Sequence, residues 1–242
     1  MRLIVCGSGS NGNTYLIESA QSCIVLDCGI KLGTVKKALD YKIMHIKFAL
    51  CTHIHSDHMA YVKDYLKMGI KVLMPMQVKE KFASEKLAIA LEPMKQIVID
   101  DFKIIPFEVP HDTNVTCFGY LIEHSEFGKL LYLTDCMYCK YNFSKQGINH
   151  ILIESNYSMD LVDRDEPNYE HRLRGHMSLD TALKFISTND NPLLLNVVLI
   201  HLSDKSGNPA LFTEETKKTI EYGANVYVAR KGLEVNLNLC PF

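Results

Sequence analysis

Four possible metal ligands lie within the seven residues from Thr52 to His58, which read Thr-His-Ile-His-Ser-Asp-His. Three neutral imidazoles and a carboxylate this close together are costly to hold in one place unless a cation lies between them. Imidazole nitrogen and carboxylate oxygen are the ligands that zinc and similar divalent metals accept. In a tight loop we expect His53 and His55 on one side, and Asp57 and His58 on the other. This alternation favours two metal ions over one.

The segments on either side of these ligands predict how they are positioned. Residues 48–51 form a short apolar run, which predicts a buried strand. Residues 59–68 have apolar side chains at helical spacing. The ligands therefore lie in a loop that connects a strand to a helix, where rigid elements can support an active site.

The His-x-His-x-Asp-His spacing resembles the signature of the metallo-β-lactamase superfamily. Its flavodiiron branch has glutamate where this chain has His55, so the histidine favours hydrolytic zinc chemistry over redox iron. The resemblance also implies how the ligands are shared between two metal ions. One metal would take His53, His55 and His111, the other would take Asp57, His58 and His201, and Asp135 would bridge them.

Positions along the chain agree with this assignment. His111 follows a β-rich segment and a proline, Asp135 follows a strand expected at 129–133, and His201 follows one expected at 196–200. Asp27 also ends an apolar strand, and in similar proteins such an aspartate orients the metal-binding loop from outside the set of ligands.

The expected strands fall into two sets, each followed by helices, which predicts two packed sheets with helices outside. We therefore expect a single α/β domain over residues 1–242, a four-layer αββα sandwich. No long segment resembles the inserted cap or flexible arm of related nucleases.

These ligands predict hydrolysis but leave the substrate open. Two metals about 3.5–4 Å apart can activate a bridging water towards a phosphodiester, an ester or a thioester. Glu154 and His176 occupy positions similar to the residues that assist catalysis in tRNase Z-type nucleases, where the carboxylate orients the histidine. A histidine so oriented could protonate the leaving oxygen; a surface histidine before a helix is the alternative. Asp57 is expected to serve both metal binding and catalysis.

Two segments are candidates for substrate contacts. The glycine-rich residues 7–13 and the basic residues 171–178 could contact phosphates through Ser8, Ser10, Asn11, Asn13, Arg172, Arg174 and Ser178. An ordinary tight turn and solvated arginines are the alternative interpretations. Together with residues 154–156 and 201–203, these segments resemble the YycJ (WalJ) group of exonuclease-like proteins. Residues 204–208 depart from the asparagine-rich stretch of that group.

Composition excludes few functions. The chain has 242 residues, 47% apolar content and a net charge of −2, so no strong overall field attracts nucleic acid or an anionic membrane. No apolar run is long enough to span a bilayer. The N-terminus becomes polar too early for a secretory signal, and the eight scattered cysteines are expected to be reduced and buried. These features predict a soluble cytoplasmic protein.

The sequence thus predicts a phosphodiesterase or nuclease that acts on DNA or RNA with two divalent ions, zinc in preference to manganese or iron. A small-molecule lactonase or thioesterase with the same metals is the alternative. A non-catalytic binding protein would usually have lost a ligand, and none is missing. The sequence does not indicate an oligomeric state. Histidines without a partner pattern are expected at the surface or at strand edges: His45, His124, His150 and His171.

Overall fold

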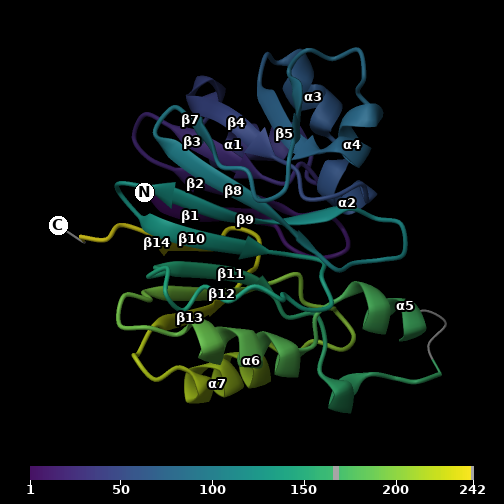
Figure 1. Cartoon of the computed structure of the whole chain (residues 1–242), viewed down its shortest axis with the longest axis vertical. Coiled ribbons are helices and arrows are strands. Elements are labelled where there is room, and N and C mark those ends of the chain that lie inside the picture. The colour runs from purple at the N-terminus through teal and green to yellow at the C-terminus, as the bar shows by residue number, and fades with distance from the viewer. Residues whose placement is uncertain (166–168, 241–242) are drawn as a thin grey trace.

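The computed structural model describes residues 1–165 and 169–240 of the chain. Two seven-stranded sheets pack face to face, and helices cover the outer face of each (Figure 1). This arrangement confirms the predicted αββα sandwich as a single domain.

The first sheet is built mostly from the N-terminal half of the chain. Its strands, in spatial order, are β14 (Glu234–Asn236), β1 (Arg2–Gly7), β2 (Thr14–Glu18), β3 (Cys23–Leu26), β4 (Ile46–Leu50), β5 (Lys71–Pro75) and β6 (Ala88–Leu91). Strands β3 to β6 run parallel to one another, whereas β2 pairs antiparallel with β3 and with β1, and β1 pairs antiparallel with β14. Three helices cover its outer face: α1 (Leu32–Ala38), α3 (Val62–Lys67) and α4 (Met76–Glu80).

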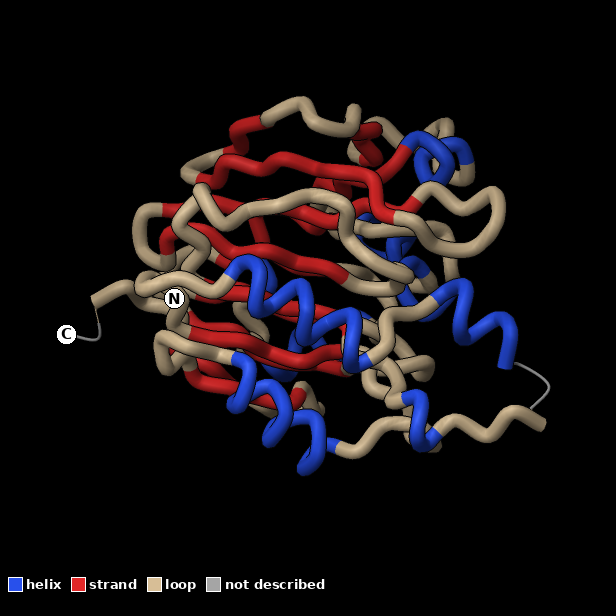
Figure 2. The backbone as a smooth tube through the Cα atoms, turned by 60° about the horizontal axis from the view of Figure 1, so that its bottom comes forward, coloured by secondary structure: helices blue, strands red, loops and turns tan. Residues whose placement is uncertain are grey.

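The second sheet repeats this plan. Its order is β13 (Asn225–Val228), β12 (Asn196–Ile200), β11 (His150–Glu154), β10 (Gly128–Leu133), β9 (Cys117–His124), β8 (Phe102–Val109) and β7 (Ile97–Ile99). Strands β10 to β13 are parallel, and β7 to β10 are antiparallel. Helices α6 (Leu179–Asn189) and α7 (Pro209–Thr219) lie across it, in front of the strands in Figure 2.

Three apolar clusters hold the layers together. The central cluster joins the two sheets through side chains such as Tyr15, Phe48, Tyr120 and Leu152, all fully buried. The other two lie between each sheet and its helices. Alternate residues of a strand point to opposite faces, so strands covered on both sides must be apolar throughout. That pattern makes β3, β4, β11 and β12 recognisable in the sequence.

The structure differs from the sequence-based expectation in several elements. The β-like segment 97–109 is not continuous, because Asp100 has a left-handed φ of 49° and turns it into the hairpin β7–β8. The helix expected at 59–68 is confined to α3 (Val62–Lys67), and a separate short helix, α2 (Ser56–Met59), precedes it. Two short strands, β6 and β14, and helix α5 (Tyr169–Gly175) were not predicted as separate elements. Such short elements have little pattern of their own and depend on pairing with neighbours.

The carboxyl ends of the parallel strands bring the site together. Asp27 follows β3, the loop 52–58 follows β4, Asp135 follows β10, and His201 follows β12. Asp27, Asp135 and His201 have left-handed φ values of 59°, 45° and 54°. Such a backbone is unfavourable for residues other than glycine, and it concentrates at functional sites.

Within the described ranges, no helix combines the length and apolar character that crossing a membrane requires.

Candidate active site

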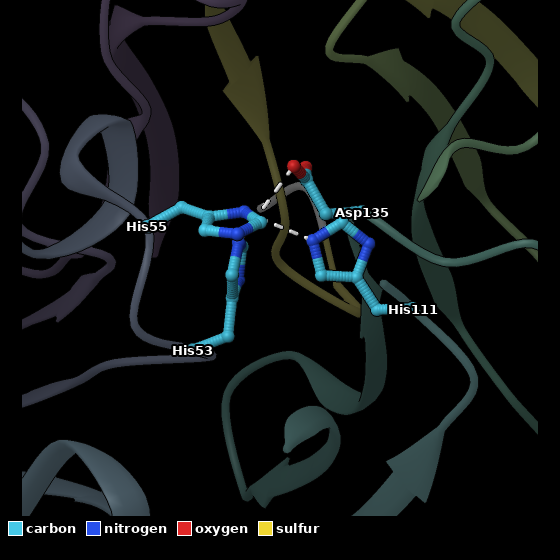
Figure 3. A group of neighbouring side chains, drawn as sticks. All are labelled: His53, His55, His111 and Asp135. Carbon is cyan, nitrogen blue, oxygen red and sulfur yellow. Dashed lines mark hydrogen bonds and ion pairs between the residues drawn. The ribbon is translucent and has the colours of Figure 1, made fainter. Parts of the chain in front are cut away.

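The first of three overlapping groups of possible ligands among the described residues contains His53, His55, His111 and Asp135. One ligand atom from each lies within 4.8 Å of the others. Figure 3 shows the three imidazoles converging beneath the Asp135 carboxylate. The Nδ1 atom of His55 is 3.0 Å from Nε2 of His111, and Nε2 of His53 is 3.8 Å from Oδ2 of Asp135. This is the set predicted for one metal.

The second group contains Asp57, His58, His201 and again Asp135, with the same spacing limit of 4.8 Å. The Nε2 atom of His58 lies 3.3 Å from Oδ2 of Asp57 and 3.2 Å from Oδ1 of Asp135. The Nε2 atom of His201 lies 3.4 Å from the same Asp57 oxygen. Asp135 therefore lies between the two groups, as a bridging ligand would.

The chemistry of these groups fits divalent cations. Nε2 of His53 and Nε2 of His201 are buried and have no hydrogen-bond partner among the described residues. Burial, together with neighbouring histidines, lowers the pKa of His53 well below its usual value and keeps it neutral, as a metal ligand must be. Burial alone would raise the pKa of Asp135, but His201 and His58 lower it well below its usual value. Burial on its own would lower the pKa of His58 and His201, but the Asp135 carboxylate raises both, so the cluster favours positive charge at this place. Ionised carboxylates and buried, unsatisfied imidazole nitrogens are compatible with two metal ions.

Asp27 is the centre of a buried hydrogen-bond network behind this cluster. Its Oδ2 atom accepts hydrogen bonds from Nδ1 of His58 at 2.7 Å and from the hydroxyl of Tyr132 at 2.6 Å. Its Oδ1 atom accepts from the backbone N–H of Thr52 at 2.8 Å and from its hydroxyl at 3.0 Å. The contact with His58 directs that ring's Nε2 towards Asp135, which supports the predicted orienting role. The parts played by Thr52 and Tyr132 were not predicted.

Glu154 contacts two histidines at once. Its Oε1 atom accepts from Nδ1 of His176 at 2.6 Å and from Nδ1 of His201 at 3.0 Å. Its Oε2 atom accepts from the backbone N–H groups of Cys136 and Met177 at 2.9 and 3.1 Å. Only His176 was expected as the partner of Glu154, and the structure also links this carboxylate to His201, a possible metal ligand. The two histidine rings stack 5.2 Å apart.

Glu154 and His176 shift each other's pKa. Burial on its own would lower the pKa of His176, but the Glu154 carboxylate outweighs burial and raises it. Conversely, burial would raise the pKa of Glu154, and His176 lowers it. Glu154 is therefore ionised, and its bond to Nδ1 leaves Nε2 of His176 as the nitrogen that can exchange a proton with a substrate.

Other contacts position the ligands from the loops. Nδ1 of His111 donates to the carbonyl of Gly175, at the end of α5, at 2.7 Å. The hydroxyl of Ser8 accepts from the backbone N–H of His201 at 2.9 Å, and the Asn156 amide donates to its carbonyl at 2.8 Å. Asn156 follows Glu154 by two residues after β11, and its signals in the sequence were this placement and the resemblance of residues 154–156 to the YycJ (WalJ) group.

The residues predicted to contact substrate do not all lie in one place: some line hollows beside the ligand cluster, one is buried behind it, and others lie on or cap helices. Ser10 lines a hollow beside His176 and His201, together with the buried side chain of Arg172, and Asn11 lines an adjoining hollow. Asn13 is buried behind the cluster, with its amide nitrogen 3.3 Å from Oδ2 of Asp57.

The remaining predicted contacts lie elsewhere. The Arg174 side chain is exposed and pairs with Glu170 at 3.4 Å, which favours the solvated alternative for it. Ser178 accepts a hydrogen bond from the backbone N–H of Thr181 and caps α6. His150, which was expected at the surface or at a strand edge, is the first residue of β11, and its side chain is fully buried. The side chain of His171 lies outside the described residues.

Comparisons with known proteins agree with this geometry. Residues 7–136, more than half of the chain, match the family model of the metallo-beta-lactamase superfamily. The exodeoxyribonuclease WalJ of Streptococcus pneumoniae is 22% identical over 231 residues, covering 84% of this chain and 81% of the relative.

Solved structures show the same fold along almost the whole chain. The metallo-beta-lactamase fold protein YhfI from Bacillus subtilis is similar with a TM-score of 0.75 and 19% identity, covering 97% of this chain and 98% of that one. The short form of human tRNase Z is similar with a TM-score of 0.71 and 14% identity, covering 98% and 99%. The family match and the cluster of histidine and aspartate ligands lead to one conclusion: the chain belongs to the metallo-beta-lactamase superfamily and is a hydrolase of that family.

Proposed function

We propose that the protein is a two-metal phosphodiesterase that cleaves DNA or RNA. The observation that carries the proposal is the Glu154–His176 pair beside the ligand cluster, with Nδ1 of His176 held by the carboxylate at 2.6 Å. Cleavage of a phosphodiester leaves an alkoxide oxygen, which needs a proton to depart. An imidazole fixed through Nδ1, with Nε2 directed away from its carboxylate, suits that task.

The other residues would prepare the substrate for this step. Two divalent ions, when bound by the predicted ligands, would supply an activated water and offset negative charge on the attacked phosphate. Asp57 would bind one of these ions and help to orient the attacking water. Asp27 and Glu154 fix His58 and His201 in place, so the ligands keep their geometry during the reaction. Arg172 stands nearby as a cation for a substrate phosphate.

The nature of the hollow beside the cluster distinguishes this proposal from the small-molecule alternative. A lactonase or thioesterase would be expected to offer an apolar pocket. Among the described residues of this lining, Leu202 is the one apolar residue, and the others are Ser10, Asn156, Arg172, His176, His201, Ser203, Asp204 and Lys205. The WalJ relative, an exodeoxyribonuclease, further supports nucleic acid as the substrate.

Zinc as the resident metal and a cytoplasmic location are parts of the same proposal. Histidine-rich ligand sets suit zinc, although manganese and iron accept the same donors. The eight cysteines are all free, and six of them are buried. Unpaired thiols of this number are typical of proteins kept in a reducing compartment.

The proposal is tested by digesting end-labelled single- and double-stranded DNA and RNA with added zinc or manganese. A variant with Asp57→Ala and His58→Ala serves as the control. We expect shortening of the labelled strand that the double variant abolishes, and the label lost first gives the polarity. Hydrolysis of a lactone or thioester, without cleavage of any nucleic acid under either metal, would refute the phosphodiesterase assignment.

A further inference from the structure

Two adjoining hollows extend from the ligand cluster across the surface. The first, the catalytic hollow, has a volume of about 260 Å³ and is lined by the residues named above around His176 and His201. The second, the glycine-loop hollow, has a volume of about 370 Å³ and lies along residues 6–12, beside Lys31, Tyr61 and Lys231. Ser10 and Asp204 line both, so the two hollows meet at these residues.

Basic side chains line this route from distant parts of the chain. Arg172 and Lys205 line the catalytic hollow, while Lys31 and Lys231 line the glycine-loop hollow. Among the described residues that line the route, Asp204 is the one carboxylate. The whole chain carries a net charge of −2, whereas Lys31 and Lys231 add two positive charges to the glycine-loop hollow.

Arg172 is built into the wall of the catalytic hollow. Its side chain belongs to α5 and is only 7% exposed, and Nη1 donates to the hydroxyl of Ser206 at 2.6 Å. A buried guanidinium fixed in this way presents its charge in one place, unlike a mobile surface lysine. It can therefore bind a phosphate close to the reacting centre.

The two lysines of the glycine-loop hollow are held beside the same loop by different elements. Lys31 immediately precedes α1. Lys231 precedes Gly232, whose backbone N–H donates to the carbonyl of Val5 at 2.8 Å and joins this turn to β1. Neither lysine forms an ion pair within the described part of the chain, so both remain available to an anionic ligand.

The glycine-rich loop keeps the passage between these cations open. Gly9 and Gly12 both have a φ of 134°, which residues with side chains rarely adopt. A Cβ on Gly12 would lie 2.5 Å from the carbonyl oxygen of Gly29. The absence of a side chain therefore lets the loop pack closely against Gly29. Tyr61, at the edge of the hollow and half-buried, offers a ring on which a base can stack.

We propose that one strand of the nucleic-acid substrate runs from the ligand cluster through the catalytic hollow, passes Ser10, and continues in the glycine-loop hollow, where Lys31 and Lys231 bind its backbone phosphates. This rests on the proposed function and adds the path that the strand takes. A row of cations with a stacking ring is how proteins hold single strands without reading their sequence. Specificity for ends or structure would then come from the catalytic hollow.

The test uses a double variant that carries both Lys31→Ala and Lys231→Ala. It is compared with wild type and with a matched control. The control is Lys71→Ala with Lys217→Ala, two exposed lysines outside both hollows. The metal-loaded enzymes are assayed at several salt concentrations with a single-stranded 12-nucleotide substrate and with bis(p-nitrophenyl) phosphate, which is too small to follow the path.

In the Lys31 and Lys231 variant we expect the KM for the oligonucleotide to rise about 25-fold at 0.1 M salt. Each of the two lost phosphate contacts is expected to raise the logarithm of KM by about 0.7. The slope of log KM against the logarithm of the salt concentration should become smaller by about 1.4. Rates with the small diester should equal those of wild type, and the control pair should behave as wild type with both substrates.

Two results would overturn the path for different reasons. If wild type cleaves the oligonucleotide and the Lys31 and Lys231 variant matches the control pair, the strand lies elsewhere while the phosphodiesterase assignment stands. If wild type hydrolyses the small diester but no polynucleotide, the nucleic-acid substrate and the path are both wrong.

Discussion

Replacing Asp27 with asparagine tests whether the network behind the cluster controls metal binding. Asparagine keeps the size of the side chain and tolerates the left-handed φ of 59° at this position. In one orientation, the amide oxygen keeps the two bonds from Thr52, and the NH₂ group replaces the oxygen that accepts from His58 and Tyr132. If the amide rotates, the bonds from His58 and Tyr132 are kept and those from Thr52 are lost. Either orientation removes one pair of contacts.

The structure limits how large the effect should be. A carboxylate that orients a ligating histidine typically contributes 10- to 100-fold to metal affinity, which is about 1.4–2.7 kcal/mol. Asp27 contacts His58, a predicted ligand of the second metal, and among the described residues no hydrogen bond joins it to His55 or His111. We therefore expect the loss to fall mainly on the second metal. Tyr132→Phe is the matched control, because it removes one bond to Asp27 and leaves the bond to His58 in place.

The assay is stepwise competition between the protein and a chelator, with both metal affinities fitted for wild type, Asp27→Asn and Tyr132→Phe. We expect weakening of one affinity by 10- to 100-fold in Asp27→Asn and a much smaller change in Tyr132→Phe. Unchanged affinities in Asp27→Asn would refute the orienting role. Equal weakening of both sites would show that Asp27 acts on the fold and not on His58.

Three further predictions concern single residues. Gly29→Ala places a Cβ 1.6 Å from the carbonyl oxygen of Asp57, so it should destabilise the chain by about 3 kcal/mol in urea unfolding, whereas Gly33→Ala meets nothing within 4 Å and should not. Equal stabilities would contradict this. Burial lowers the pKa of His150 to about 4, whereas a histidine in the unfolded chain has a pKa of about 6.5. Below about pH 6.5 the unfolded chain binds a proton that the folded protein does not, so the free energy of unfolding should fall by about 2 kcal/mol between pH 7 and pH 5. His150→Gln should lack this loss, and parallel curves for the two proteins would argue against it. His176→Ala should reduce kcat about 10²- to 10⁴-fold on oligonucleotides, but much less on a p-nitrophenyl diester, whose leaving group needs no proton. Equal losses on both would rule out proton donation.

The ligand cluster could be predicted because its signal is local and its residue types have few other uses together. His53, His55, Asp57 and His58 lie within six residues, and each remaining predicted ligand directly follows a strand or a proline. Apolar strands covered on both faces end abruptly at polar residues, so the carboxyl edge of the sheet is visible in the sequence. The two-sheet architecture follows from the same pattern.

The supporting contacts could not be predicted, because they depend on how distant segments meet. Tyr132 approaches Asp27 across the two sheets, and Ser8 reaches the backbone of His201 from the opposite end of the chain. Arg172 and Arg174 look equivalent in the sequence, yet helix α5 buries the first and exposes the second. A helix face is set by packing, which two nearby basic residues do not reveal.

The central claim is that two metal ions held by this cluster cleave phosphodiesters. The most direct measurement is titration of the metal-free protein with zinc or manganese while cleavage of a labelled oligonucleotide and bound metal are followed together. The predicted result is cleavage that rises until two equivalents are bound, with Asp135→Asn binding less metal and losing activity. Full activity at one equivalent, or two bound equivalents without phosphodiester cleavage, would contradict the claim.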